Sequence, residues 1–118
     1  MHSFGEHFLY SWGYASNTFP PDVSQLIIAA DRAASAIERV NGTQYTVESS
    51  GTLYPASGAS DDYAKSIGVS YVYTIELRPD QWDHFGFILP ERFIMPTARE
   101  TFPGLMAFTD YVKNGPFN

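Results

Sequence analysis

Apolar side chains recur every three or four positions between residues 22 and 40, a spacing that places them on one face of an α-helix. Pro21 suits the first turn of such a helix, because its missing N–H would be unpaired there anyway. Asn41-Gly42 follows the last apolar position and is typical of a helix end. We therefore predict an amphipathic helix over residues 22–40, with these recurring apolar positions: Val23, Leu26, Ile27, Ala30, Ala34, Ile37 and Val40.

Residues 69–78, VSYVYTIELR, are instead dense in β-branched and aromatic side chains. This composition predicts an interior β-strand that begins after Gly68. The strand should stop at Pro79, since proline cannot donate a hydrogen bond to a central ladder. Shorter runs predict further strands at residues 8–10 and 44–47.

Residues 49–60 are rich in glycine, serine and alanine, with Tyr54 in the middle. Low bulk and few apolar positions predict a flexible loop of the kind that lines a site or moves over it. A short helix is expected over residues 62–67, capped by Ser60 or Asp61.

The last helix is expected to start near Pro96, where Thr97 and Glu100 have the spacing of a capping box. Pro103 should kink that helix or shift its start. Two helices and about four strands in mixed order predict an α/β fold, with a mixed sheet flanked by helices.

The length and composition of the chain exclude several classes of function. The 118 residues suffice for one small domain, and a net charge of −6 argues against nucleic-acid or membrane partners while leaving a basic substrate open. No cysteine is present, and no apolar run is long enough to span a bilayer. Residues 1–6 lack the features of a signal peptide, whereas the glycosylation motif Asn41-Gly42-Thr43 is compatible with secretion.

Glu76 stands near the end of the predicted 69–78 strand, where a carboxylate is costly unless it is solvated, paired or functional. It could leave the sheet into water or pair with Arg78. It could instead be a functional carboxylate at the carboxyl end of a strand, where open α/β sheets bind their ligands. The residues alone leave both interpretations of Glu76 open. They also leave open whether Asp61 is simply a helix cap and whether His2 is simply a solvent-facing histidine.

Four segments of the chain resemble the zinc metallocarboxypeptidases of the carboxypeptidase A/B type, in that family's order and spacing. They are HSFGEHFLYSWGY (2–14), GTLYPASGASDDYA (51–64), YVYTIELR (71–78) and FGFILPERFIMPTARETF (85–102). The resemblance implies that residues 1–118 are the carboxyl-terminal part of a single catalytic domain.

The resemblance also implies roles for individual residues. His2 is similar to the third zinc ligand, and Glu76 to the catalytic glutamate beside the zinc-bound water. Tyr54 is similar to the mobile tyrosine that folds over the terminal carboxylate of the substrate. Ser3 and Phe4 would line the neighbouring subsite, on the amino side of the scissile bond.

Asp61 falls at the base of the family's specificity pocket. A carboxylate there favours Lys or Arg side chains, as in the B type, whereas an aliphatic residue would indicate the A type. The resemblance assigns no role to Glu6, His7 or His84. The chain departs from the family at Phe4, usually a tyrosine, and at Tyr63, usually a tryptophan.

The family's H-x-x-E segment, which supplies two zinc ligands, is absent, because no histidine is followed three positions later by a glutamate. By resemblance we expect a secreted enzyme, monomeric in its parent form, with one Zn²⁺ per domain, that releases carboxyl-terminal Lys or Arg from peptides. The 118 residues alone are expected to be inactive. The alternatives are a non-catalytic truncated remnant, a module that binds peptide carboxyl termini, or A-type specificity.

Overall fold

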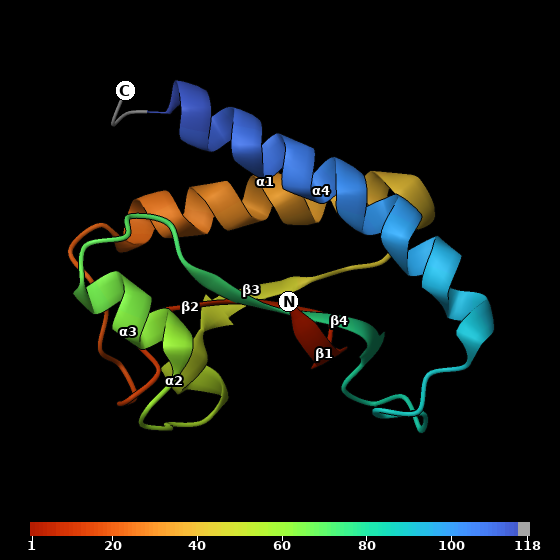
Figure 1. Ribbon diagram of the computed structural model, residues 1–118, viewed down its shortest axis with the longest axis horizontal. Coiled ribbons are helices and arrows are strands. Elements are labelled where there is room, and N and C mark those ends of the chain that lie inside the picture. The colour runs from red at the N-terminus through yellow and green to blue at the C-terminus, as the bar shows by residue number, and fades with distance from the viewer. Residues whose placement is uncertain (116–118) are drawn as a thin grey trace.

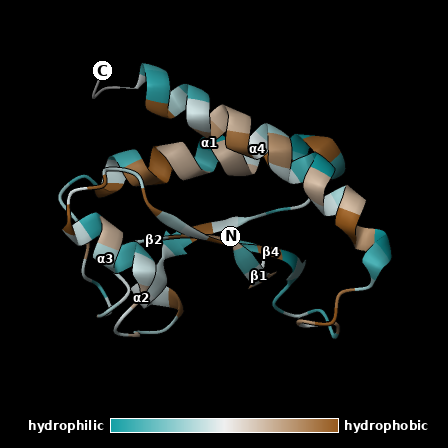
Figure 2. Cartoon of the chain, in the orientation of Figure 1, coloured by the Kyte–Doolittle hydropathy of each residue, from teal (hydrophilic) through white to brown (hydrophobic). Residues whose placement is uncertain are grey.

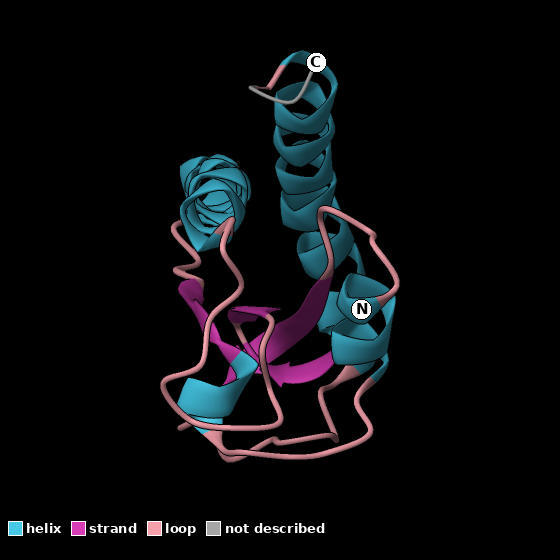
Figure 3. Ribbon diagram, turned by 90° about the vertical axis from the view of Figure 1, so that its left-hand side faces the viewer, coloured by secondary structure: helices cyan, strands magenta, loops and turns pink. Residues whose placement is uncertain are grey.

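A four-stranded mixed sheet separates two groups of helices in the computed structural model, which describes residues 1–115 (Figure 1). The long helices α1 and α4 cover one face, and the short helices α2 and α3 lie on the other. The perpendicular view in Figure 3 again shows the strands between helices. In chain order the elements are β1 (His2–Gly5), β2 (His7–Tyr10), α1 (Val23–Asn41), β3 (Thr46–Ser49), α2 (Ser50–Leu53), α3 (Ser60–Ser66), β4 (Tyr73–Asp80), the 3₁₀ turn η1 (Glu91–Phe93) and α4 (Ile94–Asn114).

Strand β4 lies inside the sheet, whose order is β1-β4-β2-β3. It runs parallel to β1 and antiparallel to β2, and β2 runs parallel to β3. Glu76 pairs in register with His2 on β1 and with His7 on β2. Because residues directly opposite one another share a face of the sheet, these three side chains emerge on the same side.

The core fills the space between the sheet and α1. Its buried members are Phe8, Ala30, Ala33, Ile37 and Tyr45. Figure 2 shows polar and apolar residues alternating along α1 and α4, as expected for helices with one buried face. The two helices approach closely, since a Cβ added at Gly104 would lie only 2.7 Å from Cγ1 of Ile37.

The structure confirms the mixed α/β sheet, the strand at residues 8–10 and the long first helix, which ends at Gly42 with a left-handed φ of 80°. Two strand boundaries were predicted wrongly. Strand β3 lies two residues later than expected, and β4 starts at Tyr73 and continues through Pro79. Pro79 is accommodated because the β1–β4 register shifts between Ser3 and Gly5, which interrupts the regular ladder beside it.

The predictions of which residues cap the starts of α3 and α4 were wrong. Within the expected loop 49–60, Ser49 caps the short helix α2 by accepting a hydrogen bond from the Thr52 amide at 3.2 Å. Ala59 occupies the cap position of α3, so neither Ser60 nor Asp61 caps that helix.

Helix α4 begins at Ile94, which places Thr97 and Glu100 inside the helix and excludes a capping box. The helix also continues through Pro103. Among the helices of residues 1–115, none combines the length and apolar character needed to cross a membrane.

Candidate active site

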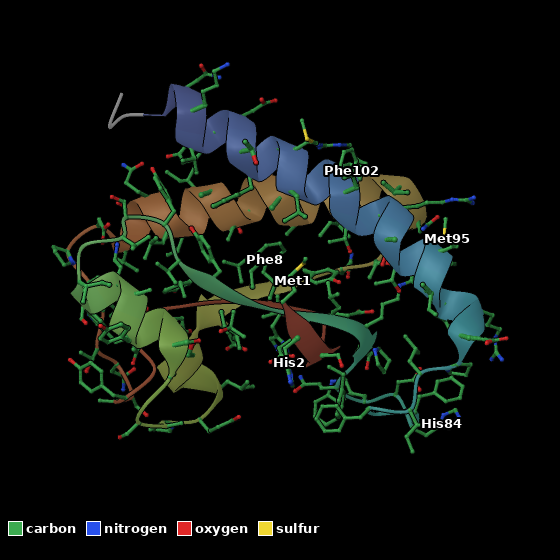
Figure 4. The ribbon with its side chains drawn as sticks, viewed as in Figure 1. Met1, His2, Phe8, His84, Met95 and Phe102 are labelled. Atoms are coloured by element: carbon green, nitrogen blue, oxygen red, sulfur yellow. The ribbon has the colours of Figure 1, made fainter. Side chains whose placement is uncertain are left out.

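A pocket of about 480 Å³ opens on the face of the sheet opposite α1, between β1, β4 and α3. His2, Asp61, Thr74 and Glu76 are among the residues that line it. Figure 4 shows His2 on the far side of the sheet from the core residue Phe8. Three residues predicted for the site from segments far apart in the chain therefore meet in one pocket.

Glu76 and His2 face each other across the β1–β4 pair, with His2 Nδ1 3.5 Å from Glu76 Oε2. This distance allows an electrostatic contact but is too long for a well-formed hydrogen bond. In agreement, Oε2 is buried without a hydrogen-bond partner among residues 1–115. Arg78 pairs with Glu100 instead, so the interpretation in which Arg78 neutralises Glu76 is wrong.

Asp61 is buried at the floor of this pocket, with 5% of its surface exposed. Its carboxylate accepts hydrogen bonds from the Ser50 hydroxyl at 3.2 Å, the Thr74 hydroxyl at 3.3 Å and the Asp62 amide at 3.1 Å. All three donors are neutral, and no cation within residues 1–115 forms an ion pair with it. A buried carboxylate in this state is suited to a cationic ligand group.

The other three predicted site residues lie apart from the pocket. Tyr54 is 66% exposed, at the end of α2. Phe4 packs its ring edge to face against Phe87, with centroids 4.9 Å apart. Ser3 pairs in register with Leu77 and so emerges on the opposite face from Glu76. The lid role of Tyr54 and the subsite roles of Ser3 and Phe4 stay predictions.

The sequence reasoning missed a pair on the Glu76 face. His7 is 3% exposed, and its Nε2 lies 3.2 Å from Glu48 Oε1 on β3. Its Nδ1 is buried and has no hydrogen-bond partner in the described part of the chain. The available signal was a histidine and a glutamate that directly flank the two predicted short strands, 8–10 and 44–47, because buried polar groups beside strands require partners.

A charged network anchors the end of β4. Arg78 Nε donates to Glu100 Oε1 at 2.6 Å, and Asn41 and Thr43 donate to Oε2. Burial alone would raise the pKa of Glu100, but these hydrogen bonds outweigh it and lower the pKa below its ordinary value. The network holds the strand that carries Glu76 against α4.

A zinc ion would find one candidate protein ligand here, His2. Catalytic zinc sites use three protein ligands and keep one position open. No cluster of three or more metal-ligating side chains occurs within residues 1–115. Residues 1–115 therefore do not form a complete zinc site by themselves.

Comparison with known proteins agrees with this geometry. A sequence profile described as zinc carboxypeptidase matches residues 1–104. Carboxypeptidase B of Astacus astacus is 44% identical over 116 residues, covering 97% of this chain and 37% of that protein. Carboxypeptidase A2 of Rattus norvegicus is 36% identical over 118 residues, covering 99% of this chain and 28% of the relative.

Solved structures show the same fold. Bovine thrombin-activatable fibrinolysis inhibitor, in complex with tick carboxypeptidase inhibitor, matches with a TM-score of 0.86 and 34% identity over 96% of this chain and 38% of that one. Carboxypeptidase A from Helicoverpa armigera matches with a TM-score of 0.84 and 29% identity over 99% of this chain and 30% of its own. The chain thus spans well under half of each of these four proteins, and it belongs to the zinc carboxypeptidase family.

Proposed function

We propose that residues 1–118 form the carboxyl-terminal part of the catalytic domain of a secreted, monomeric zinc carboxypeptidase of the B type, which releases Lys or Arg from the carboxyl ends of peptides. Membership of the family and the small share of each relative that the chain covers support this assignment. The motif Asn41-Gly42-Thr43 is compatible with secretion.

The proposed preference for basic substrates rests on the environment of Asp61. Its buried carboxylate is held by neutral donors at the floor of the pocket that Glu76 also lines. A Lys or Arg side chain entering this pocket would supply the missing positive charge, whereas an aliphatic side chain would leave the carboxylate desolvated and unpaired. The pocket therefore favours basic over aliphatic residues.

Glu76 is the proposed proton-transfer group. Its side chain is largely shielded from solvent and stands at the pocket wall. In peptide hydrolysis the water oxygen attacks the scissile carbonyl carbon, Glu76 accepts a water proton, and that proton passes to the amine as the C–N bond breaks.

His2 is the proposed contribution of this chain to the metal site, and the other ligands would come from outside these residues. Bound zinc supplies Lewis-acid activation of the water and the carbonyl group. Tyr54 would close over the substrate carboxylate, and its exposed position after α2 leaves it free to move.

A fusion protein tests the assignment. In it, this chain replaces the segment of Astacus astacus carboxypeptidase B that it matches, so that the relative supplies the region the chain does not cover. We expect zinc-dependent release of carboxyl-terminal Arg and Lys, with little release of Leu or Phe. Asp61→Ile should reverse that preference, and Glu76→Gln should abolish turnover while peptide binding persists.

The alternatives give different results in the same assay. A fusion that binds zinc and folds but does not turn over would support a non-catalytic remnant or a peptide-binding module. A fusion that prefers Leu or Phe before any substitution would show A-type specificity and refute the role given to Asp61.

A further inference from the structure

Asn41, Gly42 and Thr43 form the one Asn-x-Ser/Thr motif within the 118 residues. In secreted proteins this motif is the acceptor for N-linked glycosylation. The motif is short and also occurs by chance, so the folded position of the acceptor decides whether it suits a glycan. A suitable acceptor lies on the surface with open space beside it, because the sugar is bulky and hydrophilic.

Asn41 meets both conditions at the carboxyl end of α1. The residue is exposed, and the helix ends directly after it because Gly42 adopts a left-handed φ of 80°. Among the described residues, a Cβ added at Gly42 would have no heavy atom within 4 Å beyond its neighbours in the chain. The turn that carries the acceptor therefore leaves room for a sugar.

The network around Glu100 uses both polar side chains of the motif. The Asn41 amide donates to Glu100 Oε2 at 3.1 Å, and the Thr43 hydroxyl donates to the same oxygen at 2.9 Å and accepts from Arg78 at 2.8 Å. A glycan replaces one of the two amide hydrogens of Asn41, so the other can keep the bond to Glu100. The Thr43 hydroxyl, which a glycosyltransferase must recognise, is occupied once the chain has folded. The sugar would therefore be attached before folding.

A hollow of about 570 Å³ beside the motif provides a surface for the attached sugar. Asn41 and Trp82 both line it, and Trp82 lies in the turn that follows β4. Its side chain is 86% exposed. A single exposed aromatic residue is ordinary, but here the remaining lining is polar or charged except for two glycines. Sugars suit such a surface, because their C–H groups pack on an aromatic face while their hydroxyls pair with polar neighbours.

We propose that Asn41 carries an N-linked glycan and that the first sugars of this glycan cover the ring of Trp82. The proposal rests on the secretion proposed above, because the sugar donor, a lipid diphosphate-linked oligosaccharide, belongs to the secretory pathway. Asn41 Nδ2 forms a bond to the anomeric carbon of the oligosaccharide and loses one proton. The bond between that carbon and the diphosphate oxygen breaks, and the lipid diphosphate leaves.

Mass spectrometry of the fusion protein, expressed with a secretion signal in insect cells, tests the modification. Trypsin cleaves after Arg39 and Lys65, and Asn41 is the one asparagine of the resulting peptide, residues 40–65. We expect this peptide to carry the mass of an N-glycan, which a peptide N-glycosidase removes to leave aspartate. Asn41→Gln should abolish the modification, whereas Thr43→Ser, which keeps the hydroxyl, should retain it. If the fusion is not secreted, the same peptide is measured in the cell extract, because attachment precedes folding.

Hydroxyl-radical footprinting tests the contact with Trp82, since the oxidation rate of a side chain increases with its exposure to solvent. Trp82 should be oxidised several-fold more slowly in the glycosylated fusion than in Asn41→Gln. Tyr63 is the internal reference and should be oxidised equally in both proteins, because it is 68% exposed and lines a different hollow. If Asn41→Gln does not fold, the fusion treated with peptide N-glycosidase replaces it in the comparison.

The modification, the contact and the proposed function fail separately. An unmodified peptide 40–65 overturns the glycosylation site, whether or not the fusion is active. A modified fusion in which Trp82 is oxidised as fast as in the unglycosylated protein overturns the contact and keeps the site. A glycosylated fusion that binds zinc and folds but does not hydrolyse peptides refutes the proposed function and leaves the site in place.

Discussion

Arg78 on β4 and Glu100 on α4 form a buried ion pair between residues that lie 22 positions apart in the chain. The Glu100 side chain is completely shielded from solvent, and Arg78 Nε donates to its Oε1 at 2.6 Å. Asn41 and Thr43 donate to the second carboxylate oxygen, so both oxygens are satisfied. The pair joins the strand that carries Glu76 to the helical layer behind the sheet.

Glu100→Gln should strongly destabilise the domain, because it leaves the guanidinium of Arg78 without its counter-charge. Removal of one partner of a buried pair costs about 3–5 kcal/mol, and the partial exposure of Arg78 favours the lower value. Urea unfolding of the fusion protein measures the change in free energy. Glu91→Gln, at an exposed position of η1, is the control and should change stability little. A loss at Glu100 no larger than that of the control would show that the pair is not stabilising.

The misassignment of Glu100 illustrates a limit of sequence reasoning. Thr97 and Glu100 stand three residues apart, and that spacing is the same inside a helix as at its first turn. Only the distant partner Arg78 shows that Glu100 faces inward. By contrast, the helix over residues 22–40 could be predicted, because its apolar periodicity and its terminal glycine are local signals.

The candidate site likewise contains residues that could be predicted from the sequence and residues that could not. His2, Asp61 and Glu76 lie in short motifs that resemble a family, and the structure brings all three into one pocket. The pairing of His7 with Glu48 depends on the register between β2 and β3, two strands separated by the whole of α1. No local pattern encodes that register, so the pair emerges only from the fold.

Glu6 should make stability depend on pH. Burial, with a further contribution from Asp80, raises its pKa from 4.5 to about 7, although Arg78 opposes the shift. The folded state therefore holds a proton on Glu6 at pH values where the unfolded state has released it. The stabilisation is complete below pH 4.5 and is lost as the pH rises through about 7.

The free energy of unfolding of the fusion should accordingly decrease between these pH values, and it should decrease less in Glu6→Gln, which cannot ionise. Urea unfolding at a series of pH values measures both slopes, and their difference isolates Glu6 from other titrating groups. Because Glu6 is partly exposed, solvent screening reduces the effect. Identical slopes in the two proteins would mean that Glu6 titrates alike in the folded and unfolded states.

The 118 residues alone should neither retain zinc in stoichiometric amount nor hydrolyse peptides. They supply one candidate ligand, His2, where a catalytic site needs three. Mass spectrometry of the purified chain under native conditions measures bound metal, and release of Arg from a peptide measures activity. The fusion, assayed in parallel, is the positive control. Stoichiometric zinc with turnover by the isolated chain would show that its ligands have been misidentified.

Thr74→Val should weaken the preference for basic residues without disabling the enzyme. The Thr74 hydroxyl donates to Oδ2 of Asp61 at 3.3 Å and helps to orient that carboxylate toward the pocket. Valine has nearly the same shape but no donor. Loss of one such bond, worth about 1 kcal/mol, should lower kcat/KM for peptides that end in Arg by roughly threefold to tenfold.

Peptides that end in Leu should be almost unaffected, because an aliphatic side chain makes no ion pair with Asp61. Thr109→Val provides the matched control, since Thr109 is exposed on α4 and its hydroxyl donates to the Leu105 carbonyl of its own helix. Rates on the two peptides, measured side by side in the fusion, give the change in selectivity. An equal loss on both would mean that Thr74 supports the pocket as a whole, whereas a loss confined to Arg would show that the hydroxyl acts through Asp61.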